Sequence, residues 1–221
     1  MYQLFVGLFT EGKTDNRFLK SIVERTIYKI ALDKSIELEP YVQIIKIEEK
    51  GNGFIEQVLA ASRKGVDAFG IQFLCVHKDA DNSSDENTFK NNINPADKRL
   101  KEQNDEYCKI LIPIIPIQET ESWMLVDKEL LKLQIGTNKS DNELGINRNP
   151  ENIANPKEVI KNAIVIARKD LPKRKRKKLA ISDLYAPIGK SINMKELEKL
   201  SSYQKFEANT RDAFKKLNLL Y

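Results

Sequence analysis

Residues 4–15 read Leu4-Phe5-Val6-Gly7-Leu8-Phe9-Thr10-Glu11-Gly12-Lys13-Thr14-Asp15, a pattern that predicts a buried strand, a turn and the start of a helix. The apolar run is short and suited to a strand, and it stops before the turn residue Gly12. Thr14 or Asp15 can cap the helix, because apolar residues then recur at helical spacing. Glu11 is therefore expected at the carboxyl end of a strand, where open α/β sheets bind ligands, although an ordinary turn residue fits equally well.

A second apolar strand is predicted over residues 71–77, and Asp79 and Asp81 follow it directly. In an extended chain this spacing places both carboxylates on the same side. Two like charges so close repel each other unless a cation lies between them, and carboxylate oxygens suit Mg²⁺ or Mn²⁺. A solvated acidic turn is the alternative, because the next residues are also polar.

A third acidic pair, Glu119 and Glu121, follows a predicted strand over residues 109–117. Pro113 and Pro116 indicate that this strand lies at a sheet edge or ends early. The two glutamates share a side only if the chain there is extended. If a helix has already begun, Glu121 instead lies in its first turn, where a carboxylate favours the helix dipole.

Strands alternating with helices predict an α/β fold with a mostly parallel four-stranded sheet flanked by helices. Residues 1–126 are expected to form this α/β domain, and residues 127–221 a helical, basic region packed on it. Residues 137–155 are rich in Asn, Asp, Gly and Pro and predict a long loop, followed by a helix over residues 157–169. Trp123, the only tryptophan, is expected to anchor the core between the sheet and the C-terminal helices.

The composition indicates a globular protein. Of 221 residues, 41% are hydrophobic and 31% are charged, and no apolar run approaches the roughly 20 residues of a membrane span. A secretory signal pattern is absent, so a cytoplasmic location and no membrane partner are expected. Cys75 and Cys108 are predicted to be buried free thiols. With one histidine and no Cys-x-x-Cys motif, a zinc site is not expected.

The net charge of +5 is unevenly distributed. Residues 150–221 contain 17 Lys and Arg against 8 Asp and Glu. Six of these cations form one uninterrupted run: Lys173, Arg174, Lys175, Arg176, Lys177 and Lys178. Such a run can bind nucleic-acid phosphates, or it can be a solvated loop; no aromatic residue interrupts it, so base stacking is not indicated.

A glutamate followed by glycine after a first strand, with an Asp-x-Asp after a later one, resembles the Toprim fold. The segment Glu121-Ser122-Trp123-Met124-Leu125-Val126-Asp127 further resembles an E-x-W-L-x-D pattern in a Toprim-related family, domain-of-unknown-function family 4276, with Met in place of the usual Leu. The tail of that family is also similar to residues here, namely Leu184, Tyr185, Gly189, Leu197, Leu200 and Phe206.

This resemblance implies a metal-dependent nuclease that hydrolyses phosphodiesters of DNA or RNA. Glu11, Asp79 and Asp81 would hold Mg²⁺ or Mn²⁺, assisted by Glu119 or Glu121. Lys13 would steady a phosphate oxygen, and His77 is assigned a passive role. Such proteins often work beside an ATPase subunit in phage defence, and no nucleotide-hydrolysing motif occurs here. The alternatives are a non-catalytic module that binds nucleic acid or protein, or a phosphohydrolase of small nucleotides; the sequence indicates no oligomeric state.

Overall fold

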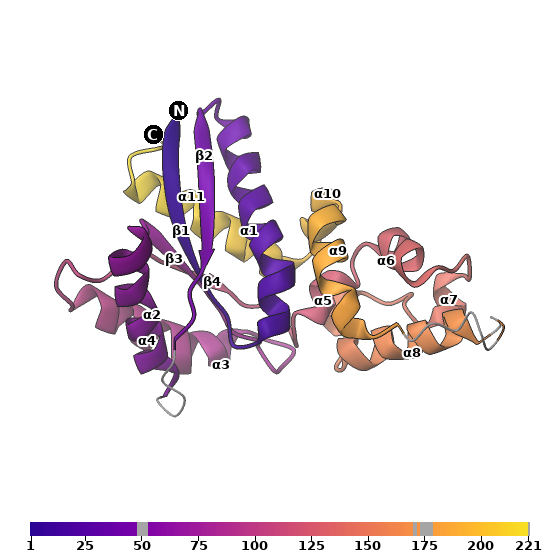
Figure 1. Cartoon of the computed structure of the whole chain (residues 1–221). Helices are drawn as coiled ribbons and strands as arrows, with labels where there is room; N and C mark the ends of the chain where they lie inside the picture. Colours follow the sequence, from indigo (N-terminus) through magenta and orange to yellow (C-terminus); the bar gives the residue numbers. More distant parts are fainter. Residues whose placement is uncertain (48–52, 170–171, 173–178, 221) are drawn as a thin grey trace.

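The computed structural model describes residues 1–47, 53–169, 172 and 179–220 (Figure 1). Its centre is a four-stranded sheet in the order β2-β1-β3-β4, and every neighbouring pair of strands is parallel. The strands are β1 (Tyr2–Phe9), β2 (Leu38–Ile44), β3 (Phe73–His77) and β4 (Leu111–Ile114). The predicted α/β class and parallel sheet are confirmed. β4 lies at a sheet edge and spans four residues, as Pro113 within it and Pro116 after it predict.

Helices cover both faces of the sheet, because parallel strands are apolar on both sides. The helices within the α/β part are α1 (Lys13–Asp33), α2 (Phe54–Phe69), α3 (Glu86–Thr88), the π-helical turn η1 (Phe89–Ile93) and α4 (Asn94–Lys101). β3 shows the two-sided burial most clearly. Phe73 and Cys75 join the core beneath α1, whereas Leu74 and Val76 join a separate core beneath α2 and α4.

The C-terminal part is helical, as expected. Its elements are α5 (Glu121–Met124), α6 (Lys128–Ile135), α7 (Asp141–Leu144), η2 (Pro150–Asn152), α8 (Pro156–Arg168), η4 (Ile181–Asp183), α9 (Tyr185–Ser191), α10 (Met194–Leu197) and α11 (Ser201–Lys216). Helices α6 to α8 form a lobe beside the sheet, and α11 returns behind the sheet (Figure 1). One apolar core runs without interruption from β1 into this lobe.

Residues 137–155 are more ordered than the predicted loop. They contain α7 and η2, and Leu144, Ile146 and Ile153 are buried in the lobe core. Ser140 caps α7 through a capping box with Glu143. The prediction of a long loop was wrong because these apolar residues are too widely spaced to produce a helical period.

Trp123 anchors the C-terminal helices, as predicted. Its ring is fully buried and packs against Tyr203 and Phe206 of α11. The indole Nε1 donates a 2.8 Å hydrogen bond to Oγ of Ser202. Trp123 therefore fixes α11 to the segment that follows β4.

Cys75 and Cys108 are buried free thiols, which confirms the sequence interpretation. Burial raises the pKa of both thiols, that of Cys108 to about 11. Among the described residues, no helix combines the length and the apolar character that crossing a membrane requires.

Candidate functional site

The candidate site lies at the carboxyl ends of β1, β3 and β4 (Figure 1). β1 delivers Glu11, β3 delivers Asp79, and the segment after β4 delivers Thr120. Parallel strands bring these ends to one edge of the sheet. The sequence therefore placed Glu11 and Asp79 at the correct edge.

Asp79 is held by three hydrogen bonds at its Oδ1 atom. The backbone N–H of Thr120 donates at 2.9 Å, the Thr120 hydroxyl lies at 3.3 Å, and Nε2 of His77 lies at 3.2 Å. Burial raises the pKa of Asp79, but the bonds from His77 and Thr120 lower it by more, so the net pKa lies below its usual value. Asp79 is consequently a fixed carboxylate at neutral pH.

His77 is fully buried at the end of β3. Burial lowers its pKa, but the bond to Asp79 and the charges of Asp79, Asp15 and Glu11 together raise it. Three carboxylates thus act on one imidazole, from the turn after β1, from α1 and from the segment after β3. No solvent reaches its ring, and its Nε2 lies against Asp79, so His77 is placed to hold that carboxylate. The passive role expected for it stays a prediction.

Asp15 is a site residue that the sequence interpretation missed. It was expected to cap α1, yet Gly12 is the N-cap residue and no side chain caps the helix. The Asp15 carboxylate instead folds back over Gly12, so that a Cβ added at Gly12 would lie 2.3 Å from its Oδ2. Burial raises the pKa of Asp15, and the charge of Asp79 adds to this effect, although His77 and Thr120 oppose it.

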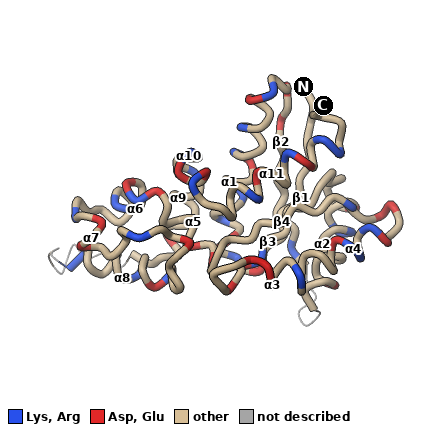
Figure 2. Tube along the Cα trace, turned by 180° about the vertical axis from the view of Figure 1, so that it is seen from behind, with Lys and Arg blue, Asp and Glu red and all other residues tan. Residues whose placement is uncertain are grey.

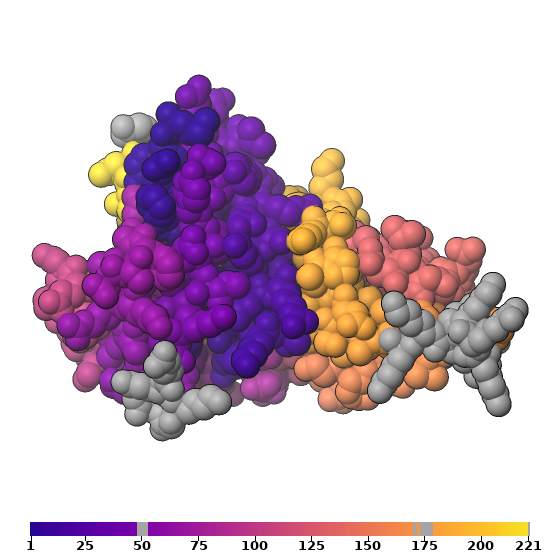
Figure 3. Space-filling view, in the orientation of Figure 1, coloured from indigo at the N-terminus to yellow at the C-terminus, as the bar shows by residue number. Residues whose placement is uncertain are grey.

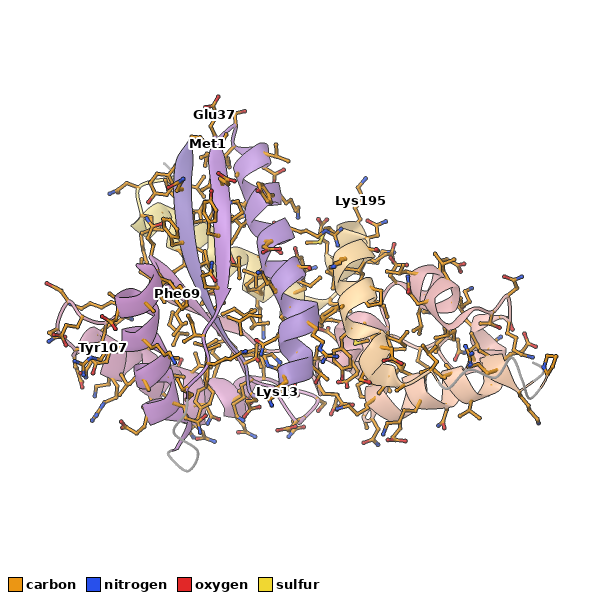
Figure 4. The ribbon with its side chains drawn as sticks, in the orientation of Figure 1. Met1, Lys13, Glu37, Phe69, Tyr107 and Lys195 are labelled. Carbon is orange, nitrogen blue, oxygen red and sulfur yellow. The ribbon has the colours of Figure 1, made fainter. Side chains whose placement is uncertain are left out.

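Glu11 forms an ion pair with Lys78, whose Nζ lies 2.7 Å from its Oε1. The Glu11 side chain is 42% exposed. Lys13, the cation that the sequence assigned to phosphate, is exposed at the start of α1 (Figure 4) and forms no ion pair within the described part of the chain. Lys78 is therefore the cation in direct contact with the Glu11 carboxylate.

Glu119 and Glu121 share one lysine, Lys157, and their predicted role as metal ligands stays a prediction. Nζ of Lys157 lies 2.9 Å from Oε1 of Glu121 and 3.4 Å from Oε2 of Glu119. The Lys157 backbone N–H also donates to Glu119 at 2.8 Å, and the Tyr185 hydroxyl donates to the buried Glu121. Since α5 begins at Glu121, the helical alternative for these two residues is correct.

This cluster shifts two further pKa values. Burial lowers the pKa of Lys157, but its bonds to Glu121 and Glu119 raise it by more, and the net shift is upward. Burial raises the pKa of Tyr185, and the bond to Glu121 raises it further. Both groups therefore keep their protons at neutral pH. These four residues, Glu119, Glu121, Lys157 and Tyr185, connect α5, α8 and α9, and we call them the clasp.

Asp81 does not follow the extended geometry that the sequence argument assumed. Its φ angle is +51°, in the left-handed region, and the side chain is exposed. Its backbone N–H donates to the carbonyl of Gln118, which has a φ angle of +64°. Because alternation of side chains requires extended backbone, the spacing of Asp79 and Asp81 does not by itself place both carboxylates on one side.

The donors at this edge suit a hard divalent cation in kind, because carboxylate oxygens dominate. Their arrangement does not yet form a metal cage. Within the described residues, no group of three or more His, Cys, Asp or Glu side chains is placed to hold a metal ion. Glu11 is engaged by Lys78, and Asp79 by His77 and Thr120.

The basic run of residues 173–178 lies outside the described residues. In the described part of residues 150–221, 11 Lys and Arg stand against 7 Asp and Glu. Figure 2 shows the described charges of both signs interspersed over the molecule. Much of the predicted charge asymmetry therefore rests on the run itself.

The fold and the site define an α/β protein with an acidic site at the carboxyl edge of a four-stranded parallel sheet. The chain belongs to the family described as a domain of unknown function, DUF4276, whose model matches residues 10–188. This range includes Glu11, Asp79 and the clasp residues, and it confirms the family resemblance read from the sequence. The sheet is consistent with a Toprim-like fold. No curated protein and no solved structure matches the chain.

Proposed function

We propose that this protein is a metal-dependent nuclease that hydrolyses phosphodiesters. One observation carries the proposal: Glu11 and Asp79 follow two neighbouring parallel strands, β1 and β3, and so lie at the carboxyl edge of the sheet, where His77 and Thr120 hold Asp79. Such concentrated negative charge, partly removed from water, is costly unless it serves a cation or a reaction. The family resemblance supports the same reading, since Toprim-like proteins carry out this chemistry.

Glu11 and Asp79 would hold Mg²⁺ or Mn²⁺. The bound ion would polarise the phosphodiester and lower the pKa of a water molecule. Glu11 would exchange Lys78 for the ion, which would leave the Lys78 ammonium available to a phosphate oxygen. His77 and Thr120 would keep Asp79 oriented and ionised. Glu119 and Glu121 would keep Lys157 and stabilise the clasp.

The partners named by the resemblance belong to this proposal as well. We propose DNA or RNA as the substrate class, with residues 173–178 contributing to its binding, and an ATPase subunit as a partner in phage defence. The cytoplasmic location expected from the sequence stays a prediction. An isolated chain that is inactive until its partner is added would fit this arrangement.

The direct test is cleavage of DNA and RNA with Mg²⁺ or Mn²⁺ by the wild type and by Asp79→Asn, each with and without candidate ATPase partners. The asparagine keeps the size of the side chain and removes the charge. We expect the variant to lose cleavage by about two orders of magnitude or more, because metal-assisted catalysis requires the carboxylate. Equal cleavage by both proteins would rule out Asp79 as a metal ligand.

A second candidate function, a non-catalytic binding module, is favoured by the pairing of the acidic groups. Glu11 has Lys78, Glu119 and Glu121 have Lys157, and Asp79 has His77. A site neutralised in this way can be a structural element of the fold. DNA binding with a steep salt dependence and no response to a chelator would favour this candidate.

A further inference from the structure

A cavity of about 810 Å³ opens beside Glu11, at the carboxyl ends of β1 and β2 and against the first turns of α1. We call it the α1 groove. Its volume falls in the range of about 300–1,000 Å³ that is typical of ligand pockets. α9 packs along α1, so Lys190 at the end of α9 also lines the groove (Figures 1 and 3).

The walls of the α1 groove are strongly basic. The cations among the lining residues are Lys13, Arg17, Lys20, Lys46 and Lys190, and Glu11 is the carboxylate among them. Three of these cations lie on α1 at positions i, i+4 and i+7, which places them along one helix face over about 10 Å. Lys13, Arg17 and Lys190 form no ion pair with any other described residue. Their charges are therefore available to an anionic ligand.

The floor of the groove has the opposite character. Ile44 at the end of β2 and Ile47 just after it are the partly exposed apolar residues there, and the nearly buried Phe9 and Ile45 lie beneath them. Near the floor, Oδ1 of Asn16 is buried without a hydrogen-bond partner among the described residues. The ligand that fits combines phosphates for the basic walls, apolar rings for the floor and a polar donor for Asn16.

We propose that the α1 groove binds a single strand of nucleic acid. Proteins that bind such strands combine a positively charged groove along the backbone with hydrophobic, usually aromatic, side chains against which the unpaired bases pack, and here isoleucines take that place. A duplex fits less well, because its bases face inward and cannot contact the floor. The Arg17 guanidinium can bind a phosphate through two parallel hydrogen bonds. This inference rests on the proposed function, in which a strand bound in the groove would place one of its phosphodiesters beside Glu11.

The test measures binding apart from catalysis. A fluorescein-labelled oligothymidylate of about 12 nucleotides is titrated with protein in excess chelator, with anisotropy as the readout. The variant Arg17→Glu/Lys190→Glu inverts two groove charges. The control Lys98→Glu/Lys216→Glu makes the same change in net charge at exposed residues of α4 and α11 that form no ion pair with described residues. Circular dichroism confirms that both variants are folded.

We expect the groove variant to bind about tenfold more weakly or worse, while the control stays near the wild type. The slope of the salt dependence is expected to fall by about 0.7 for each phosphate that the variant no longer neutralises. Wild-type affinity in the groove variant would overturn the proposal. Equal weakening in both variants would do the same, because it would reveal non-specific attraction. Tighter binding of a duplex of equal length would also overturn it, because a single strand would then not be the preferred ligand of the groove.

The outcome is independent of the nuclease assay. If the groove variant loses binding and the wild type never cleaves, the proposal that the groove binds a single strand is supported and the proposed catalytic function fails. If the wild type cleaves while the groove variant binds normally, only the groove proposal fails.

Discussion

The carboxylate of Asp79 accepts a 2.9 Å hydrogen bond from the backbone N–H of Thr120, which ties the end of β3 to the residue just before α5. The Thr120 hydroxyl lies 3.0 Å from Nε2 of His77, and both side chains are fully buried. One threonine thus orients the acid and the histidine of the candidate site.

Replacement of Thr120 by valine keeps the shape of the side chain and removes the hydroxyl. The variant is expected to lose about 1–3 kcal/mol of unfolding free energy, because His77 and Asp79 lose a buried hydrogen-bond partner. Urea denaturation measures the loss. Thr120→Ser restores the hydroxyl and should recover most of it. Equal stability of the valine and serine variants would contradict the role assigned to the hydroxyl.

Lys157→Met leaves the carboxylate of Glu121, only 2% exposed, without its cation. Breaking a fully buried ion pair costs about 3–5 kcal/mol, and the 41% exposure of Lys157 reduces this to roughly 2 kcal/mol. Lys161→Met is the matched control one turn further along α8, because its partner Glu158 is exposed. Its expected effect is below about 1 kcal/mol. Similar effects of the two substitutions would show that the clasp adds no stability.

The close approach of α9 to α1 depends on Gly189. A Cβ at this position would lie 2.6 Å from the carbonyl oxygen of Phe18, which is backbone and cannot move aside. Gly189→Ala is expected to destabilise the fold by about 1–3 kcal/mol, as overpacking does. Gly53→Ala is the control, because nothing lies within 4 Å of its added Cβ. A neutral Gly189→Ala would mean that the two helices are not in this contact.

The lowered pKa of Glu207 predicts how the free energy of unfolding depends on pH. Burial raises its pKa, but Lys29 and Arg211 lower it by more, and the net pKa lies below the ordinary value of 4.5. A folded-state pKa below the unfolded one contributes stability above the unfolded pKa, and this stability is lost as the pH falls through the folded pKa. The difference in unfolding free energy between the wild type and Glu207→Gln should therefore shrink from about pH 6 to about pH 3. A constant difference would contradict the pKa shift.

The sheet was predictable from the sequence because its signals are local. The apolar runs ending at Phe9 and His77 mark β1 and β3, and alternation with helices implies parallel pairing. Glu11 and Asp79 follow from the ends of these strands. To predict that both residues lie at the same edge, it was enough to know that parallel strands bring their carboxyl ends together.

The rest of the site depends on contacts between distant segments. Lys157 and Tyr185 reach Glu121 from α8 and α9, and no spacing in the sequence announces these contacts. Asp15 had a usable signal, since it lies in the first turn of the helix that begins directly after Glu11 and Gly12. It was read as a helix cap because aspartate favours that role. The left-handed backbone at Asp81 and Gln118 could not be predicted either, because the sequence argument assumed an extended chain in which side chains alternate.

The central claim is that Glu11 and Asp79 share one metal site, and titration calorimetry with Mn²⁺ tests it most directly. It needs no substrate or partner. Wild-type protein and Glu11→Gln are compared, with Glu158→Gln as a control that removes an exposed carboxylate of α8. We predict that the wild type and the control bind Mn²⁺ and that Glu11→Gln loses this binding. Undiminished binding in Glu11→Gln, or no binding by any of the three at about millimolar Mn²⁺, would contradict the claim.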